Sequence, residues 1–189
     1  GNKCNLACRM CHPGSSSLLA KNLMEMEGNI ITSSNDGLYD FDRSNRDKIL
    51  DLFYKCENLR QVYFLGGEPL INDFHDEIIE LLINKNRNKD ISIHYSTNLQ
   101  IDIEKFFPIW EQFKLIDLNV SIDGSAEVYE YIRWPGRWKK LYSNLEKACI
   151  FSKDSNLHPT VASTVQNLNA HNLPDLIETL NAEGHHPHK

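Results

Sequence analysis

The chain has 189 residues, 41% of them apolar, and a formal net charge of −6. This length and composition predict one folded domain rather than a disordered chain. The acidic balance argues against a broad surface for nucleic-acid phosphates or anionic lipid, so we expect a small molecule or a peptide as partner. No apolar run approaches the ~18 residues that a membrane span needs, and no secretory leader precedes the first cysteine, which favours a cytoplasmic location.

Predicted helices and strands alternate along most of the chain. In chain order they are a short helix and loop (15–42), a helix capped by Ser44 that reaches Cys56, a strand (61–65), a helix (74–83), a strand (91–96), a helix (103–113), a strand (115–122), one or two helices (126–152), a strand (160–165) and a helix (173–182). Cys56 and Cys149, each beside apolar residues, are expected to be buried free thiols. Regular alternation predicts parallel strands with crossover helices, hence an α/β sheet or barrel.

Three of the five cysteines, Cys4, Cys8 and Cys11, form a C-x-x-x-C-x-x-C loop. Such clustering favours a metal or cluster site in a reducing compartment over a disulfide framework. A structural zinc site needs four ligands, and the nearby fourth candidate, His12, is adjacent to Cys11 and poorly placed to complete the tetrahedron. Three thiolates would instead leave one iron of a 4Fe–4S cluster without a protein ligand, and an open iron can bind substrate. Zinc remains the weaker alternative.

Every predicted strand is followed by hydrogen-bonding residues. In strand order these are Gly66-Gly67-Glu68-Pro69, then Ser96-Thr97-Asn98, then Ser121 with Asp123-Gly124, and finally Thr164, Gln166, Asn167 and Asn169. Because the carboxyl ends of parallel strands share one face of such a fold, and that face carries the active site, we expect these residues to meet. Turn formation alone could explain any one group. Four groups beside a cysteine cluster favour a binding site.

The motif C-N-L-A-C-R-M-C, then G-G-E-P, then S-I-D-G and a downstream arginine resemble the radical S-adenosylmethionine (SAM) superfamily over nearly the whole chain. The resemblance implies a (β/α)6 TIM-like barrel, here partial. We expect residues 1–189 to be the core domain without its first strand and its C-terminal portion. In this family the open iron chelates SAM, and one electron from the cluster cleaves SAM to a 5′-deoxyadenosyl radical that abstracts hydrogen from a substrate.

The resemblance also implies roles for individual residues. The cluster ligands would be Cys4, Cys8 and Cys11, and the SAM-binding residues would be Gly66, Gly67, Glu68, Pro69, Thr97, Asn98, Ser121, Arg133 and Val165. Within this set, the Gly66–Pro69 segment receives the SAM ammonium group, and the forked donors of Arg133 suit the SAM carboxylate. Ser121 contacts the ribose or carboxylate, and Val165 lies near the adenine or the substrate. No catalytic side chain is assigned.

The cysteine motif and the Ser-rich stretch after it resemble members that carry an additional twitch or SPASM cluster domain, some of them viral or environmental. Those members modify peptides or protein side chains or rearrange nucleotides, and we expect a substrate of one of these kinds. The implied electron donor is a flavodoxin or ferredoxin. The alternatives are an iron–sulfur electron-transfer protein or a zinc-stabilised module without SAM chemistry. The G-G-E-P and S-I-D-G motifs favour the enzyme, since a carrier has no need of them.

Overall fold

Four parallel strands form the centre of the molecule. The computed structural model describes residues 1–27 and 43–182. The strands are β1 (Gln61–Phe64), β2 (Ser92–Thr97), β3 (Leu115–Ser121) and β4 (Leu157–Ala162). They pair in the order β1-β2-β3-β4, each parallel to the next. The predicted α/β fold is therefore confirmed, and the described sheet is an open part of the expected TIM-like barrel.

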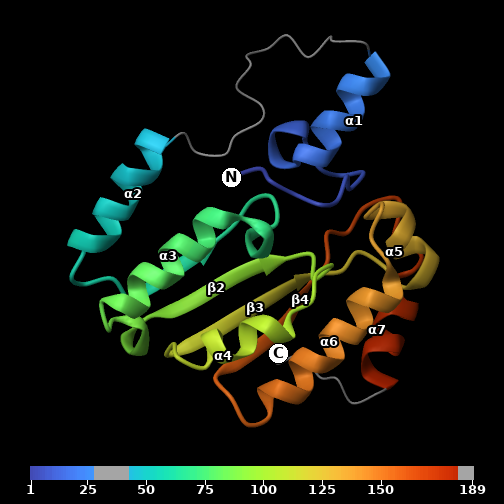
Figure 1. Ribbon diagram of the computed structural model, residues 1–189. Helices are drawn as coiled ribbons and strands as arrows, with labels where there is room; N and C mark the ends of the chain where they lie inside the picture. The colour runs from blue at the N-terminus through green and yellow to red at the C-terminus, as the bar shows by residue number, and fades with distance from the viewer. Residues whose placement is uncertain (28–42, 183–189) are drawn as a thin grey trace.

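Helices connect the strands and cover one face of the sheet. They are α1 (Ser17–Glu27), α2 (Arg43–Lys55), α3 (Asp73–Asn84), α4 (Phe107–Trp110), α5 (Ala126–Ile132), α6 (Trp138–Ser152) and α7 (Leu173–Ala182), with 3-10 turns at Pro13–Ser15, Pro69–Ile71, Asn88–Asp90 and Glu104–Phe106. Figure 1 shows α3, α4 and α6 in front of the sheet, and the N-terminal segment and α1 beyond the tips of the strands. The cysteine loop therefore lies at the carboxyl end of the sheet.

The core lies between the sheet and these helices. Side chains alternate between the two faces of a strand, so every second residue points toward the helices. On β2 and β3 these are Ile93, Tyr95, Ile116, Leu118 and Val120, all essentially without exposed surface. The intervening residues of the same strands are largely polar, as expected for a face that lines a site rather than a core. The alternation explains why both strands were predictable from sequence.

The predicted boundaries were wrong in two places that involve proline. The strand predicted over 160–165 begins at Leu157 and ends at Ala162, and Pro159 lies inside it at the edge of the described sheet, where proline is tolerated. The helix predicted over 103–113 is a 3-10 turn followed by the four-residue α4. Pro108 explains the break, because proline lacks the N–H that a continuous helix would use there.

Two predictions about α2 were also wrong. Ser44 lies inside this helix, which begins at Arg43, so it is not the residue before the first turn. Cys56 is exposed rather than buried, because α2 ends one residue earlier, at Lys55. Cys149 is half-buried against the core. The predicted loop over 28–42 lies outside the described residues.

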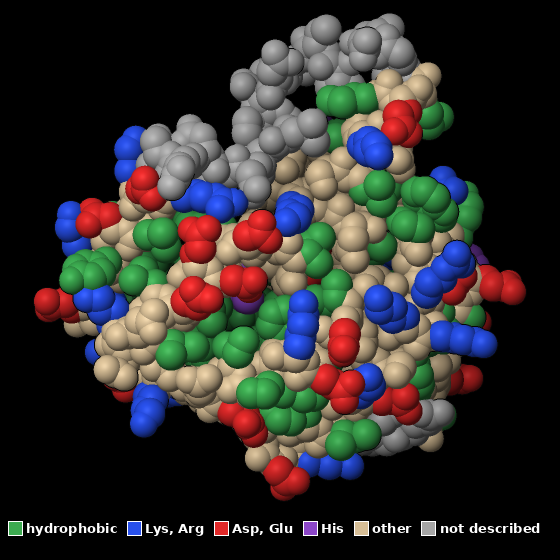
Figure 2. Space-filling view, viewed as in Figure 1, with side chains coloured by type: hydrophobic (Ala, Val, Ile, Leu, Met, Phe, Trp, Pro, Cys, Tyr) green, Lys and Arg blue, Asp and Glu red, His purple; other side chains and the backbone are tan. Residues whose placement is uncertain are grey.

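The surface carries mixed charge. Lys and Arg side chains lie interspersed with Asp and Glu over the face seen in Figure 2. Among the described residues, no helix combines the length and the apolar character needed to cross a membrane.

Candidate functional site

A glycine turn joins the end of β1 to the segment before the first cysteine. Gly66 and Gly67 have φ angles of +80° and +61°, in the left-handed region that favours glycine. A Cβ atom on Gly67 would lie 2.4 Å from the backbone oxygen of Lys3. This close approach lets the Glu68 amide donate to the same Lys3 oxygen at 2.8 Å. The G-G-E-P turn therefore holds the chain immediately before Cys4.

Glu68 is a buried carboxylate that ties the first two strand ends together. Its side chain accepts hydrogen bonds from the Thr97 hydroxyl at 2.8 Å, the Asn98 amide at 2.7 Å and the Leu70 amide at 3.3 Å. Burial raises the pKa of Glu68, while these donors and the Arg133 charge act to lower it. The predicted juxtaposition of Glu68, Thr97 and Asn98 is found in the structure. The contact of Glu68 with a SAM ammonium group stays a prediction.

The side chain of Asn98 reaches from the end of β2 to the cysteine loop. Its amide nitrogen donates to Asn5 Oδ1 at 2.8 Å and lies 3.9 Å from Cys4 Sγ. On the other side of Cys4, the Cys4 amide donates to Ser17 Oγ at 3.0 Å, and this hydroxyl donates to the Cys4 carbonyl at 3.2 Å. The first cysteine is thus held between a strand end and the start of α1.

The second half of the loop is fixed by the end of α5. The Ala7 amide donates to the Trp134 carbonyl at 2.7 Å, and the Arg9 amide donates to the Ile132 carbonyl at 2.8 Å. The Arg9 side chain donates to the Tyr131 carbonyl at 2.9 Å, and its guanidinium lies 3.9 Å from the centre of the Tyr131 ring. These contacts place Cys8, between the two bonded amides, against the carboxyl end of α5.

The three thiols interact electrostatically with one another. Burial raises the pKa of Cys4, and it raises the pKa of Cys8 to about 11, with the Arg133 charge opposing the rise at Cys8. The charge of Cys11 adds to the rise at both. A ligating cysteine must be deprotonated, and the nearby guanidinium favours the thiolate.

The thiols of the cysteine loop are compatible with the ligand set of a 4Fe–4S cluster. Within the described ranges, no three His, Cys, Asp or Glu side chains come close enough together to hold one metal ion. A 4Fe–4S cluster takes each cysteine on a different iron, so its thiolates stand further apart than the ligands of one zinc ion. Three cysteines from one short loop are compatible with ligation of three irons of such a cluster.

Asp123 of the S-I-D-G motif was expected among the strand-end residues of the site, but no cofactor contact was assigned to it. Its side chain is fully buried. Arg133 Nε and Nη2 lie 2.7 and 2.6 Å from Asp123 Oδ2, and the Thr164 amide donates to Oδ1 at 2.7 Å. The motif itself was the available signal. The pairing with an arginine ten residues away required the fold.

The last two predicted residues lie at the ends of β3 and β4. Ser121 is half-buried and ends β3 in register with Ala162 of β4. Val165 lies beyond β4 and is 66% exposed, since the strand ends before it. Ser121 thus shares the carboxyl edge of the sheet with the residues around Glu68. The assignment of Val165 to adenine or substrate stays a prediction.

Comparison with known proteins agrees with this arrangement. Residues 1–180 match the family model described as Radical SAM superfamily. The chain is 25% identical, over 186 residues, to an uncharacterized protein of Methanocaldococcus jannaschii, a match that covers 97% of this chain and 57% of that protein. The chain spans about half the length of this relative and of anSMEcpe, and about a third of the length of SuiB.

Two solved structures share the fold. Native anSMEcpe with bound AdoMet and a Cp18Cys peptide has a TM-score of 0.65 at 16% identity, covering 97% of this chain and 46% of that one. SuiB of Streptococcus suis bound to S-adenosylmethionine has a TM-score of 0.59 at 14% identity, covering 97% and 36%. At these identities the likeness establishes the fold alone.

Proposed function

Because the chain belongs to the radical SAM superfamily, we propose that it forms the core of an enzyme that holds a 4Fe–4S cluster on Cys4, Cys8 and Cys11 and binds SAM at the neighbouring strand ends. This family uses both cofactors. When bound, the reduced cluster supplies the electron that cleaves SAM to methionine and a 5′-deoxyadenosyl radical, which takes hydrogen from the substrate. The site residues act by binding and orienting these groups.

One observation carries the proposal: the cysteine loop and the strand ends are a single hydrogen-bonded unit. Glu68 binds the end of β2 through Thr97 and Asn98, and Asn98 reaches Cys4. A carrier or a zinc module would gain nothing from a buried carboxylate that joins two strand ends to a cysteine loop. An enzyme that must hold SAM between a cluster and a sheet needs this connection.

The chain's own residues would divide the work as follows. The Gly66-Gly67 turn keeps side chains away from the segment that leads into the cluster loop. The backbone of this turn, with Pro69 and Glu68, would bind the SAM ammonium group, while Thr97, Asn98 and Ser121 would bind the remainder of SAM at the edge of β2 and β3. Val165 would lie near the adenine or the substrate.

The broader features of the protein are part of the same proposal. We infer one core domain over residues 1–189 and a cytoplasmic enzyme reduced by a flavodoxin or ferredoxin. The substrate would be a peptide or protein side chain, or a nucleotide, as in members with a twitch or SPASM domain. The peptide held by anSMEcpe supports the first class.

The test is anaerobic reconstitution of the full-length protein with iron and sulfide, followed by incubation with SAM and dithionite. We expect iron and sulfide in cluster stoichiometry and formation of 5′-deoxyadenosine, detected by mass spectrometry. Replacing Cys8 with serine should abolish both. The matched control is Cys149→Ser, because this half-buried thiol lies outside the loop and its loss should leave both signals intact. A loaded cluster without SAM cleavage, or zinc without iron, would contradict the proposal.

A further inference from the structure

Asp123 and Arg133 form a buried ion pair at the edge of the site. Asp123 follows β3, and Arg133 directly follows the last residue of α5. Both guanidinium contacts within the described residues go to one oxygen of Asp123, and the other oxygen accepts the Thr164 amide after β4. The carboxylate thus has partners on two further segments of the chain. Moving Arg133 away would leave the Asp123 carboxylate buried without a charged partner, which is costly in free energy. The pairing therefore holds the arginine side chain in place.

Arg133 lies against the cysteine loop, because its two chain neighbours bond to the loop backbone. Its charge opposes the rise in pKa that burial causes at Cys8 and at Glu68. The residues on either side of it, Ile132 and Trp134, accept the backbone bonds of the loop. Its side chain is 12% exposed. Arg133 is therefore part of the site wall and not a surface charge.

The contacts of Arg133 leave one binding edge of the guanidinium available. A guanidinium presents five donors in a rigid plane and can bind one carboxylate along its Nε–Nη2 edge and another along its Nη1–Nη2 edge. Asp123 occupies the first edge, as the two contacts to Oδ2 show. The second edge suits the carboxylate of SAM, which is the role expected for Arg133.

We propose that Asp123 is a positioning residue: it holds Arg133 so that the second edge of the guanidinium binds the SAM carboxylate, and the pair thereby selects SAM over its decarboxylated form. This inference rests on the proposed function. The predicted effect on SAM binding is opposite to the one expected from charge alone, because the negative charge of Asp123 also repels the SAM carboxylate. Removing that charge would strengthen the attraction of Arg133 for SAM if charge alone mattered, and would weaken binding if fixed geometry matters more.

The experiment compares two ligands that differ by one carboxylate. Dissociation constants for SAM and for decarboxylated SAM are measured by anaerobic equilibrium dialysis on the full-length protein with its cluster oxidised and no reductant. The wild type should prefer SAM by about tenfold to a hundredfold, the range for hydrogen bonds to a charged group. Arg133→Gln should abolish the preference, so that the dissociation constants of the two ligands become about equal. Asp123→Asn should reduce the preference for SAM to about threefold or less, while the affinity for decarboxylated SAM changes little.

The control variant is Glu104→Gln, which removes an ion pair with Lys147 on the surface, away from the strand ends. Its preference should equal that of the wild type. A purely structural role for Asp123 predicts that Asp123→Asn weakens both ligands by the same factor, which would overturn the inference. An increased preference for SAM in Asp123→Asn would overturn it as well, because charge would then outweigh geometry.

A second variant covers the case in which Asp123→Asn does not fold. Arg133→Lys keeps the positive charge next to Asp123 but has a single nitrogen and no second edge. The inference predicts that its preference for SAM falls close to that of Arg133→Gln, whereas a full wild-type preference would overturn it. Failure of the wild type to bind either ligand would instead refute the proposed function, and with it this inference.

Discussion

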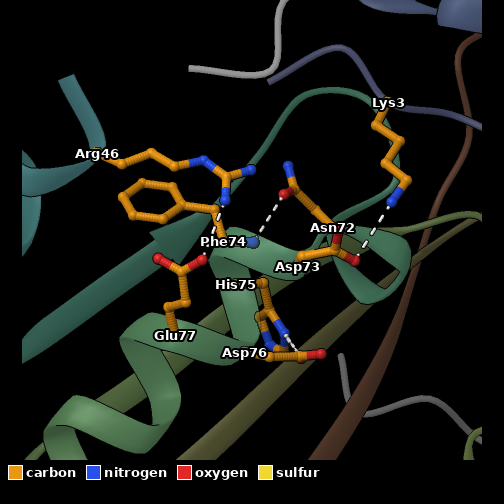
Figure 3. A network of polar contacts seen from close by, with 8 residues as sticks. All are labelled: Lys3, Arg46, Asn72, Asp73, Phe74, His75, Asp76 and Glu77. Atoms are coloured by element: carbon orange, nitrogen blue, oxygen red, sulfur yellow. Dashed lines mark hydrogen bonds and ion pairs between the residues drawn. The ribbon is translucent and has the colours of Figure 1, made fainter. Parts of the chain in front are cut away.

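Two groups of charged residues in this protein differ mainly in burial. The first lies at the carboxyl ends of the strands and contains Glu68, Asp123 and Arg133. Both carboxylates are essentially without exposed surface. Glu68 accepts hydrogen bonds from Leu70 in its own turn and from the end of β2, and Asp123 accepts them from Arg133 after α5 and Thr164 after β4. The second lies on the first turns of α3, where Lys3 pairs with Asp73 and Arg46 of α2 pairs with Glu77 (Figure 3). In this second group the acidic side chains of both pairs are well exposed.

The difference shows where charge serves function and where it serves the surface. Burying a carboxylate costs several kcal/mol of desolvation, which must be offset by several partners, so such groups persist where a site needs them. Exposed pairs contribute about 0 to 1 kcal/mol each and tolerate replacement. Lys3 belongs to both regions: its backbone oxygen receives the Glu68 amide, while its side chain lies in the exposed group. The predictions below test this contrast, from the largest expected effect to the smallest.

The largest effect is expected at the glycine turn that supports the buried group. Gly67→Ala would place a Cβ atom 2.4 Å from the Lys3 oxygen at a positive φ, so backbone must move. We expect a loss of about 3 kcal/mol or more in the free energy of unfolding, measured by urea denaturation, and a failure to load the cluster. Gly14→Ala is the matched control, because its nearest contact is a side chain, that of His12, and it should lose under about 1 kcal/mol. Equal losses in both variants would contradict the prediction.

Glu68→Gln tests the buried carboxylate itself. Of the two oxygens, Oε1 accepts from Leu70 and Thr97, and Oε2 accepts from Asn98. A glutamine must turn its NH2 group toward at least one of these donors, which leaves a buried donor unpaired. We expect a loss of about 1 to 3 kcal/mol in the free energy of unfolding, reduced by the lower desolvation cost of a neutral group. If the variant unfolds with the same free energy as the wild type, the buried carboxylate does not contribute more to stability than an exposed one.

Sequence predicted the fold well where the chain is periodic. Strands β2 and β3 were placed within one residue, because alternating apolar side chains such as Ile93, Tyr95 and Leu118 mark the face toward the helices. The errors concern element boundaries near proline residues, where the effect of proline depends on its place in the fold. The strand predicted over 160–165 begins three residues earlier and contains Pro159, and the segment around Pro108 was predicted as one continuous helix.

The site was predictable in its parts but not in its connections. Cysteine spacing and the G-G-E-P and S-I-D-G motifs are local signals, and they marked the cysteine loop and the strand ends that the structure brings together. The bond from Asn98 to the loop joins residues 94 positions apart, and the ion pair of Asp123 with Arg133 depends on how α5 returns to the sheet. Contacts of this kind depend on how the chain folds back on itself, and no local residue pattern predicts them.

Asp76, another exposed acid on the first turn of α3, offers a smaller, pH-dependent effect. The hydrogen bond from His75 lowers the pKa of the Asp76 carboxyl below its ordinary value of 3.8. A lowered folded-state pKa means that the stabilisation is fully present above about pH 4 and is lost as the pH falls through the folded-state value. We expect unfolding free energy to drop less on acidification from pH 5 to 2 in Asp76→Asn than in the wild type. Identical acid profiles would contradict the assignment.

The smallest effect is expected at the partly exposed pair of Arg46 and Glu77, whose nitrogen and oxygen lie 3.0 Å apart. Glu77→Gln removes the charge and keeps the shape of the side chain, and Arg46 retains its position over the Phe74 ring. We expect a change of at most about 0.5 kcal/mol, decreasing further in 1 M salt because exposed charges are screened. Urea denaturation at low and high salt measures both. A loss as large as that of Glu68→Gln would show that the pair ties α2 to α3, and that exposure alone does not separate the two groups of charges.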